Sequence, residues 1–294
     1  MNNYKGIILA GGSGSRLFPI TNGLSKQLLP IYNKPMIYYP LSTLMQANIK
    51  NILIITSKEY LNFYKNILQD GAKFGLEIEY AVQKKPNGIA EAFLIGEKFI
   101  GKSNVVLILG DNIFYGADMS KILNEAKQET GATIFGFYVS DPQRFGVVSF
   151  NKKNRNIVSK IEEKPKKPKS NYAVTGLYFY DNEVIKIAKN LKPSPRGELE
   201  ITDINNKYLT KNKLFIKKFE KGYAWLDTGT FNSLNDASNF IKILEERQGL
   251  MVGCPEEISI KNKWVTKKQM SNIINKYSNN EYKEYIKKLL NQNF

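Results

Sequence analysis

The sequence predicts an α/β fold with a mainly parallel sheet flanked by helices. Apolar stretches of strand length alternate with stretches of helical spacing through the first half of the chain, which is typical of βαβ units. Several of the strand-like stretches are apolar at almost every position, as expected for strands that are buried on both faces. With 294 residues, 42% of them hydrophobic, the chain is long enough for one large domain with a substantial core.

The first half of the chain supplies the parallel strands and several flanking helices. Gly6 to Ala10 is a short apolar run followed by glycines, so we expect a buried strand there. Pro35 to Ile49 carries apolar side chains at helical spacing, and Asn51 to Thr56 is a continuous apolar run. We expect further helices over residues 59–68, 88–99 and 119–129, and further strands over 77–83, 105–109 and 133–139.

The second half changes character, because short strand-like stretches are now divided by polar turns. We expect strands over 144–150, 156–161, 172–180 and 214–219, with a charged, proline-broken connection over 162–169. Helical spacing predicts helices over 182–191, 200–210, 231–248, 267–276 and 281–291. The pattern indicates one domain over 1–240, with a C-terminal helical extension over 241–294 that packs on it.

Composition excludes several classes of protein. No apolar run approaches the ~20 residues of a membrane span, and the start of the chain lacks the layout of a signal peptide. A single cysteine, Cys254, excludes an intrachain disulfide and suits a reducing compartment, so we expect a cytoplasmic protein without a membrane partner.

Charge and histidine content narrow the chemistry further. The chain contains no histidine, which excludes histidine-based acid–base catalysis, histidine-activated nucleophiles and histidine metal ligands. Phosphoryl-type transfer fits this limit, because it depends on positioning and electrostatic stabilisation. The formal net charge is +16, but the lysines are scattered along the chain. We therefore expect polyanionic small substrates such as nucleotides rather than nucleic acid.

A glycine-rich loop follows the first strand and is the main candidate for a phosphate site. Gly11, Gly12 and Gly14 leave backbone N–H groups free to converge on an anion, and a short helix can start near residue 15. Arg16 and Lys26 would add two full positive charges. The spacing fits neither the Rossmann fingerprint nor the P-loop, and a flexible turn is the alternative for the glycines alone.

Two isolated carboxylates are the candidates for a metal site. Asp111 comes directly after a buried strand, where ligands gather in an open parallel sheet, and Asp227 stands between an apolar run and a glycine. Both could hold Mg²⁺, which prefers oxygen ligands and is usually shared with substrate phosphates. The alternative for Asp111 is a turn cap.

The chain carries a series of further motifs, and the resemblance that they support runs from Lys5 to about Trp264. They are LAGGSGSRLFP (9–19), KQLLP (26–30), QKKPNG (83–88), GDN (110–112), RFGVV (144–148), EEKP (162–165), AVTGLYFY (173–180), SPRGELEITD (194–203), WLDTG (225–229), RQGL (247–250) and CPEE (254–257). In this order and spacing they resemble the sugar-1-phosphate nucleotidyltransferases, and within that family the glucose-1-phosphate thymidylyltransferases. The resemblance implies a Rossmann-like nucleotidyltransferase sheet, a small β-rich sugar-binding part, and a catalytic domain over 1–240.

The resemblance also implies the reaction and its participants. They are dTTP, α-D-glucose 1-phosphate and Mg²⁺, in a homotetramer that catalyses the first step of dTDP-L-rhamnose synthesis. Alternatives are another base, as in uridylyl-, cytidylyl- or adenylyltransferases, and a non-catalytic nucleotide-binding subunit of the same fold. One methyl group separates thymine from uracil, so base choice is the weakest point of a sequence argument.

The resemblance assigns roles to individual residues. Arg16 and Lys26 are implied to be catalytic, and Asp111 and Asp227 to hold Mg²⁺. Nucleotide contacts are implied for Leu9, Gly11, Gly12, Ser13, Gly14, Gln27, Gln83, Pro86 and Gly88. Sugar-phosphate contacts are implied for Gly146, Glu163, Lys164, Val174, Gly176 and Arg196.

Two departures from the family pattern carry expectations of their own. Phe145 stands where the family often has tyrosine, so we expect one hydroxyl contact near the sugar to be missing. The family also implies a second nucleotide site, used for feedback by dTDP-L-rhamnose, and its residues here are Tyr115, Gly116, Lys221, Gly222, Glu256, Glu257 and Lys261. Lysines replace the expected arginines and cannot bind a phosphate through two parallel bonds, so we expect weaker inhibition.

Overall fold

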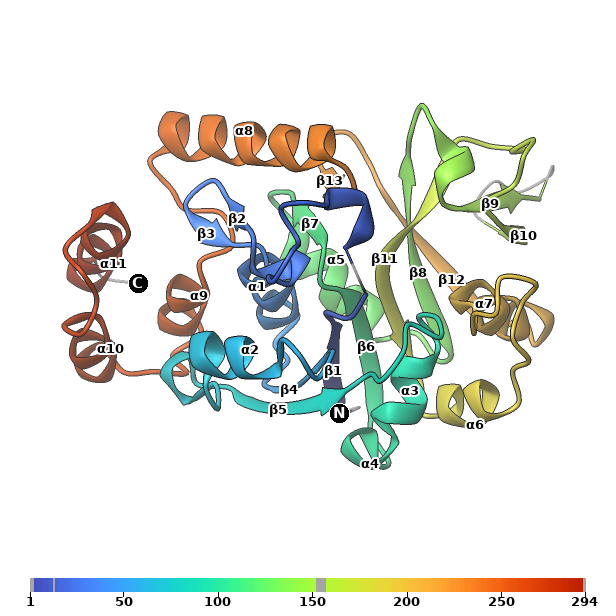
Figure 1. Ribbon diagram of the computed structural model, residues 1–294, viewed down its shortest axis with the longest axis horizontal. Coiled ribbons are helices and arrows are strands. Elements are labelled where there is room, and N and C mark those ends of the chain that lie inside the picture. The colour runs from blue at the N-terminus through green and yellow to red at the C-terminus, as the bar shows by residue number, and fades with distance from the viewer. Residues whose placement is uncertain (1–2, 13, 152–156, 293–294) are drawn as a thin grey trace.

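The computed structural model describes residues 3–12, 14–151 and 157–292 (Figure 1). The strands are β1 (Tyr4–Leu9), β2 (Pro30–Ile31), β3 (Lys34–Pro35), β4 (Asn51–Thr56), β5 (Glu77–Val82), β6 (Asn104–Leu109), β7 (Asn112–Tyr115), β8 (Ala132–Tyr138), β9 (Gly146–Phe150), β10 (Val158–Glu163), β11 (Tyr172–Tyr180), β12 (Leu214–Phe219) and β13 (Ala224–Asp227). Within the described residues, nine of these strands form one mixed sheet with the order β10-β9-β11-β6-β1-β4-β5, in which β8 pairs with β11 and β12 pairs with β8.

Strand β1 lies in the middle of the parallel part of the sheet. It pairs in parallel with β4 on one side and β6 on the other, so that Ile7 lies between Leu53 and Leu107. Ile7 packs into the hydrophobic core on one face of the sheet and Ile8 into the core on the other. Because both faces are covered, these strands can be apolar at nearly every position, as the sequence predicted.

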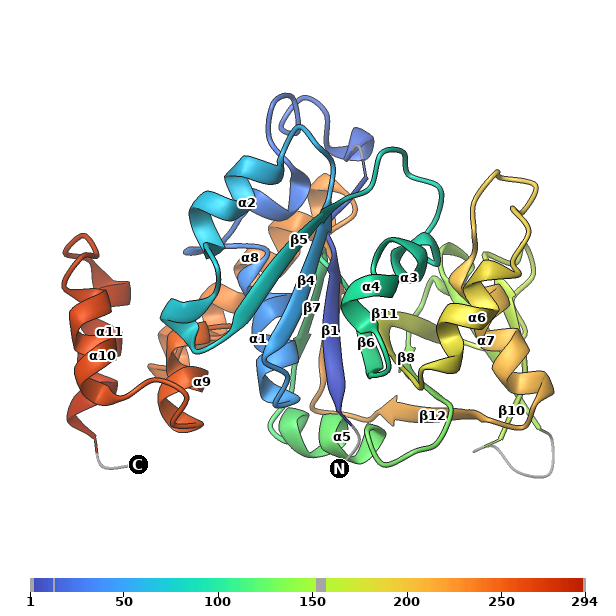
Figure 2. The same cartoon turned by 90° about the horizontal axis from the view of Figure 1, so that it is seen from below.

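Helices cover both faces of the sheet, and Figure 2 shows the two layers on opposite sides of β1, β4 and β5. The helices are α1 (Tyr38–Gln46), α2 (Leu61–Leu68), α3 (Glu91–Ile95), α4 (Glu97–Ile100), α5 (Met119–Ala126), α6 (Glu183–Lys189), α7 (Ile201–Thr210), α8 (Phe231–Gln248), α9 (Pro255–Lys261), α10 (Lys267–Ile274) and α11 (Glu281–Asn291). Helices α1, α2 and α5 contribute to one core, while α3, α4, α6 and α7 contribute to the other. The expected fold class, a sheet with parallel central strands flanked by helices, is confirmed.

The second half of the chain extends the sheet with antiparallel strands. Strand β11 runs antiparallel to β6, β8 and β9, and β9 forms an antiparallel hairpin with β10. This is the β-rich part that the polar turns of the sequence predicted. The expected strand over 144–150 begins only at Gly146, because Pro142–Arg144 forms a 3₁₀ turn. Asn156, the first residue of the next expected strand, lies outside the described residues.

Two predicted helices differ from the structure. Helix α1 begins at Tyr38 rather than at Pro35, because Lys34–Pro35 pairs with Pro30–Ile31 in the small β2–β3 ribbon. The single helix expected over 88–99 is wrong, since α3 and α4 are separated at Gly96. A Cβ at Gly96 would lie 2.9 Å from Ile7 Cδ1 and 3.0 Å from the carbonyl oxygen of Ala92, so the helix breaks where it packs closely against β1.

Helix α8 and the last three helices complete the molecule. Helix α8 lies along one edge of the structure, above β2 and β13, and α9 to α11 form a cluster at one end (Figure 1). The sequence did not predict α9 or the β7–β13 pair. Helix α8 continues through residue 240 without a break. The boundary expected there, between the catalytic domain and the C-terminal extension, therefore stays a prediction. In the part of the chain that the structure describes, no helix is both long and apolar enough to cross a membrane.

Candidate active site

The candidate site lies where β1 and β6 end side by side. Leu9 pairs with Leu109 in register, and the chain then turns into the glycine loop after β1 and into Gly110-Asp111 after β6. Gly12 and Gly14 have φ angles of +102° and +59°, which glycine adopts without strain. The expected short helix is present as a 3₁₀ turn over Ser15–Leu17. Ser13 lies outside the described residues.

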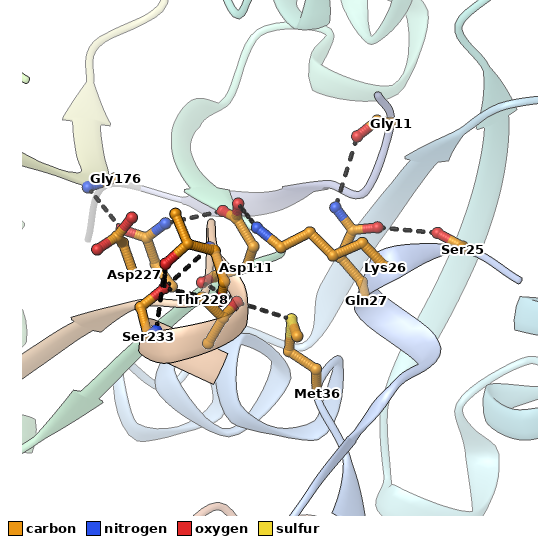
Figure 3. Close-up of polar contacts among 12 residues, drawn as sticks. Gly11, Ser25, Lys26, Gln27, Met36, Asp111, Gly176, Asp227, Thr228 and Ser233 are labelled. Atoms are coloured by element: carbon orange, nitrogen blue, oxygen red, sulfur yellow. Dashed lines mark hydrogen bonds and ion pairs between the residues drawn. The ribbon is translucent and has the colours of Figure 1, made fainter. Parts of the chain in front are cut away.

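Lys26 and Asp111 form an ion pair at this edge of the sheet (Figure 3). Lys26 Nζ lies 2.5 Å from Asp111 Oδ2, and the two side chains are 8% and 26% exposed. Asn112 Nδ2 donates to the other carboxylate oxygen of Asp111 at 2.9 Å. Burial alone would raise the pKa of Asp111, but the charge of Lys26 and the hydrogen bonds from Lys26 and Asn112 hold that pKa below its usual value. Asp111 is therefore an ionised carboxylate beside a cation.

The second predicted carboxylate reaches the same place through the β7–β13 pair. Asp227 on β13 is the register partner of Asn112 on β7. Thr228 donates to the carbonyl oxygen of Asp111 from its backbone N–H at 3.3 Å and from its hydroxyl at 3.0 Å. These bonds join the two segments that the sequence separates by more than a hundred residues. Asp111 and Asp227 are thus held at one site (Figure 3).

Arg144 also belongs to this site, although sequence reasoning gave it no role. Its Nη2 lies 3.0 Å from Asp227 Oδ2, and its Nη1 lies 2.8 Å from Asp141 Oδ2. The hydrogen bond from Arg144 to Asp141 is the main reason why the pKa of the guanidinium is raised, and the charge of Asp227 adds to it. The only sequence signal for Arg144 was its place at the start of the RFGVV motif. Each of the two candidate metal ligands is thereby paired with a basic side chain.

A cavity of about 380 Å³ opens in front of these charges, between the end of β6 and the antiparallel part of the sheet. The predicted residues that line it are Arg16, Asp111, Gly146, Glu163, Lys164, Val174, Gly176 and Asp227. Sequence reasoning missed several other lining residues, among them Asn112, Thr202 and Trp225. Thr202 Oγ1 donates to Glu163 Oε2 at 2.6 Å and so orients that carboxylate. Phe145 packs its ring against Trp225, with centroids 5.0 Å apart.

Other predicted residues lie beside the cavity rather than in its lining. Gln27 is 4% exposed, accepts from Ser25 Oγ at 2.8 Å, and donates to the carbonyl oxygen of Gly11 at 3.5 Å, so it supports the glycine loop. Arg196 donates to Glu198 at 2.6 Å and to Glu200 at 3.1 Å. It is therefore paired within its own loop and is not among the residues that line the cavity.

The other residues predicted to contact the nucleotide follow β5, except for Leu9. Gln83 directly follows β5 and is 6% exposed. Gly88, at φ +107°, packs against the backbone of Leu199 so closely that a Cβ would lie 2.4 Å from the carbonyl oxygen of Leu199. Pro86 is exposed in the loop between them, and Leu9 is the last residue of β1.

The predicted regulatory residues separate into two groups. Tyr115, Gly116, Glu257 and Lys261 line a second cavity of about 570 Å³ between α1, α5, α8 and α9, whereas Lys221 and Gly222 are not part of its lining. Glu256 is fully buried and accepts hydrogen bonds from Tyr277 at 2.8 Å and Tyr282 at 2.5 Å. A ligand in the second cavity therefore has no access to its carboxylate.

Two carboxylates of the site, Asp111 and Asp227, are candidates to share a cation with a substrate. Among the described residues, no group of three or more histidine, cysteine, aspartate or glutamate side chains is arranged to bind a metal ion. Asp111 and Asp227 supply two carboxylates at one cavity, which is the usual protein share of a Mg²⁺ site completed by phosphates and water.

Comparisons with known proteins agree with this arrangement. Residues 5–243 match the family model described as nucleotidyl transferase. A glucose-1-phosphate thymidylyltransferase of Neisseria meningitidis is 53% identical over 287 residues, which is 97% of this chain and 99% of the relative. One from Mycobacterium tuberculosis is 49% identical over 289 residues, which is 98% of this chain and 100% of the relative.

Solved structures support the same assignment. The crystal structure of a Bacillus anthracis protein described as a glucose-1-phosphate thymidylyltransferase, in complex with a sucrose, is 46% identical in sequence. Its TM-score is 0.74 over 81% of this chain and 94% of that one. A UDP-glucose pyrophosphorylase complexed with UDP-glucose shares the fold, at 24% identity and a TM-score of 0.73 over 83% of this chain and 100% of that one. The chain is therefore a nucleotidyltransferase enzyme that belongs to the nucleotidyl transferase family and, within it, to the glucose-1-phosphate thymidylyltransferases.

Proposed function

We propose that this protein transfers the thymidylyl group of dTTP to α-D-glucose 1-phosphate, giving dTDP-glucose and pyrophosphate. The observation that carries the proposal is the Lys26–Asp111 pair, which lies between the glycine loop and a cavity large enough for a sugar phosphate. The relatives that match nearly the whole chain are named for this reaction, which supports the choice of substrates.

The nucleophile in this proposal is an oxygen of the sugar 1-phosphate. A phosphate monoester has a second pKa near ~6, so this oxygen is already ionised at neutral pH and needs no general base. That requirement matches a chain without histidine. The oxygen attacks the α-phosphorus of dTTP in line, a new P–O bond forms, and the bond to pyrophosphate breaks with its electron pair on the leaving oxygen.

The chain's own cations offset the negative charge that develops during this displacement. Lys26 faces the strand ends, and the guanidinium of Arg16 lies near Gly229, whose Cβ would be 3.3 Å from Arg16 Nη1. Positive groups fixed in place before the reaction cost no reorganisation in the transition state. The backbone of Gly11, Gly12 and Gly14 would bind the triphosphate, and the segment over 83–88 would contact the base.

Asp111 and Asp227 would hold Mg²⁺ together with substrate phosphates, where the ion would supply positive charge at the reacting phosphorus. In the free protein, Lys26 and Arg144 each contact Oδ2 of one of these carboxylates. The two carboxylates would therefore be shared between the cation and these basic side chains, with the Lys26 ammonium group beside the phosphates.

Glucose 1-phosphate would bind in the 380 Å³ cavity. Its hydroxyl groups would meet Gly146, Glu163, Val174 and Gly176, with Glu163 oriented by Thr202. Lys164 would bind the 1-phosphate. Arg196 would join it only after exchanging a bond to Glu198 or Glu200 for one to the phosphate.

A pyrophosphate-release assay tests the proposal directly. It crosses dTTP, UTP, CTP and ATP with glucose 1-phosphate and other sugar 1-phosphates. We expect the highest kcat/KM with dTTP and glucose 1-phosphate. The thymine methyl group contributes ~1–3 kcal/mol to the preference over UTP, which differs from dTTP in its ribose 2′-hydroxyl as well. Faster release with CTP or ATP, or with another sugar phosphate, would contradict the assignment.

Several finer statements belong to the same proposal and rest on the family resemblance. They are a homotetramer in the cytoplasm, a role in the first step of dTDP-L-rhamnose synthesis, and feedback by dTDP-L-rhamnose at the second cavity. Tyr115, Gly116, Glu257 and Lys261 would contact the feedback ligand there. Analytical ultracentrifugation measures the assembly, and inhibition kinetics measure the feedback.

A further inference from the structure

The side chain of Gln83 lies against the glycine loop, which is part of the proposed nucleotide site. A Cβ built on Gly11 would lie 2.5 Å from Gln83 Oε1, so the amide oxygen directly borders the loop. Gln83 is 6% exposed, so the amide group is held close to this position. An amide offers a donor at one end and an acceptor at the other, so its orientation decides which bases it can accept.

Two acceptors determine this orientation. Gln83 Nε2 donates to Glu91 Oε2 at 2.8 Å and to the carbonyl oxygen of Gly88 at 3.4 Å. Carboxylate and carbonyl oxygens cannot donate, so the nitrogen of the amide must face them. Within the described part of the chain, no donor reaches Gln83 Oε1. The oxygen is therefore the end of the amide that is presented beside the glycine loop.

Glu91 is the stronger of the two acceptors and is itself held in place. Its bond to Gln83 is charge-assisted and short, whereas the bond to Gly88 is long. Its other oxygen, Oε1, accepts from Asn87 Nδ2 at 2.8 Å, and Glu91 stands in the first turn of α3. Both carboxylate oxygens are thus engaged, which fixes the position of the group that Gln83 contacts.

We infer that Glu91 is a positioning residue that sets base selection by fixing the amide of Gln83 with its oxygen toward the base. Thymine and uracil carry a ring N–H between their two carbonyl groups, and this N–H can donate to Gln83 Oε1. Cytosine has a bare ring nitrogen at the same place, so two acceptors would face each other. The inference rests on the proposed nucleotide site, and it concerns selection among pyrimidines rather than turnover.

The test is the binding of dTTP and dCTP to the full chain, measured by isothermal titration calorimetry. The measured quantity is the ratio of the two dissociation constants. In Glu91→Ala the amide of Gln83 is free to turn, so we expect discrimination against dCTP to fall at least about tenfold. Glu91→Gln keeps an acceptor oxygen and should retain most of the discrimination. Glu91→Met removes both oxygens at similar size and replaces Glu91→Ala if that variant does not fold.

A double-mutant cycle separates this role from a structural one. In the Gln83→Ala background, Glu91→Ala should change the ratio no further, because Glu91 acts through the amide. Glu97→Ala, which removes an exposed glutamate on the adjacent helix α4, is the matched control and should leave the ratio unchanged.

Three results would overturn the inference. The first is the same ratio of dissociation constants in Glu91→Ala and the wild type. The second is that Glu91→Ala lowers this ratio equally in the wild type and in the Gln83→Ala background. The third is a wild type that binds dCTP as tightly as dTTP. Turnover is measured separately in the same preparations. A wild type that discriminates in binding but releases no pyrophosphate from dTTP and glucose 1-phosphate would contradict the proposed function while the inference stands.

Discussion

The two cavities share strand β7 but are lined by different kinds of residue. Strand β7 begins with Asn112 at the 380 Å³ cavity, which we propose binds glucose 1-phosphate and call the substrate cavity. It ends with Tyr115 at the second cavity. The substrate cavity carries six charged side chains in its lining, namely Arg16, Asp111, Arg144, Glu163, Lys164 and Asp227. The second cavity is larger, yet only Glu257 and Lys261 of its lining residues are charged.

This difference indicates that the substrate cavity is suited to ligands held mainly by charge. The second cavity is suited to ligands held mainly by uncharged contacts. Charges that are partly removed from water need a partner of opposite sign while no ligand is present, and at the substrate cavity Lys26–Asp111 and Arg144–Asp227 form such pairs. The second cavity is surrounded instead by hydroxyl, amide and apolar groups. Its two charged lining residues, Lys261 and Glu257, pair with each other at 2.5 Å, and a separate pair, Lys34–Glu245, is sealed beneath the surface outside the lining.

The largest expected effect concerns that sealed pair. Lys34 Nζ lies 2.7 Å from Glu245 Oε1, and the side chains are 1% and 6% exposed. Glu245→Ala would leave the ammonium of Lys34 buried without a counter-charge, so we expect the free energy of unfolding to fall by roughly 3–5 kcal/mol. Urea denaturation measures it. Glu246→Ala, one position away in a largely exposed pair, is the control, and an equal loss in both would contradict the argument.

The next effect concerns the substrate cavity. Lys26→Ala removes the cation that the mechanism uses at the α-phosphate, so we expect kcat to fall by roughly 10²–10³-fold. Steady-state pyrophosphate release measures kcat, and thermal unfolding of the same sample checks that the variant is folded. Lys98→Ala, an exposed lysine on α4, is the control and should keep its turnover. Near-normal turnover in Lys26→Ala would remove this residue from the mechanism.

Arg144 gives a smaller expected effect at the same cavity. Arg144→Ala would free Asp227 from its basic partner and remove one positive group from the lining. We expect kcat/KM for glucose 1-phosphate to fall about tenfold. Arg144→Lys keeps the charge but cannot contact Asp141 and Asp227 with two parallel groups, so it should recover only part of the loss. Full activity in Arg144→Ala would show that the ion pair matters only for structure.

The smallest expected effect on turnover belongs to the second cavity. Lys261→Ala should change kcat without effector by less than about twofold, because the lining of this cavity shares no residue with that of the substrate cavity. The same change should weaken inhibition by dTDP-L-rhamnose, measured as its inhibition constant. Lys263→Ala is the control outside the lining. Lost turnover in Lys261→Ala would contradict the separation of the two cavities, and unchanged inhibition would contradict the proposed contact between Lys261 and the feedback ligand.

The sequence predicted the parts of the fold in which burial dominates. Strands β1, β4 and β6 are buried on both faces, so their apolar runs were sufficient to identify them. The β7–β13 pair has four residues in each strand and α9 has seven, which is too short for a clear periodicity. The break between α3 and α4 was missed because Gly96 inside a helical pattern is often tolerated.

The sequence identified most of the residues proposed for the site. It did not reveal which of these side chains form ion pairs with one another. Lys26 and Asp111 were each identified from local motifs, but their ion pair joins positions 85 residues apart. Arg144 was missed because a single arginine in a polar turn has no periodic signal, and its role depends on Asp227 from β13. Arg196 was identified from a motif, and only the structure revealed that two glutamates of its own loop hold it.

Helix α8 has a practical consequence for anyone who shortens this protein. The nucleotidyl transferase family model ends at residue 243, inside the helix, which spans Phe231–Gln248. A chain cut at that point would keep every residue that lines the substrate cavity. It would nevertheless lose Glu245, the buried partner of Lys34, together with α9 to α11, so we expect the folded enzyme to need residues beyond the end of the family model.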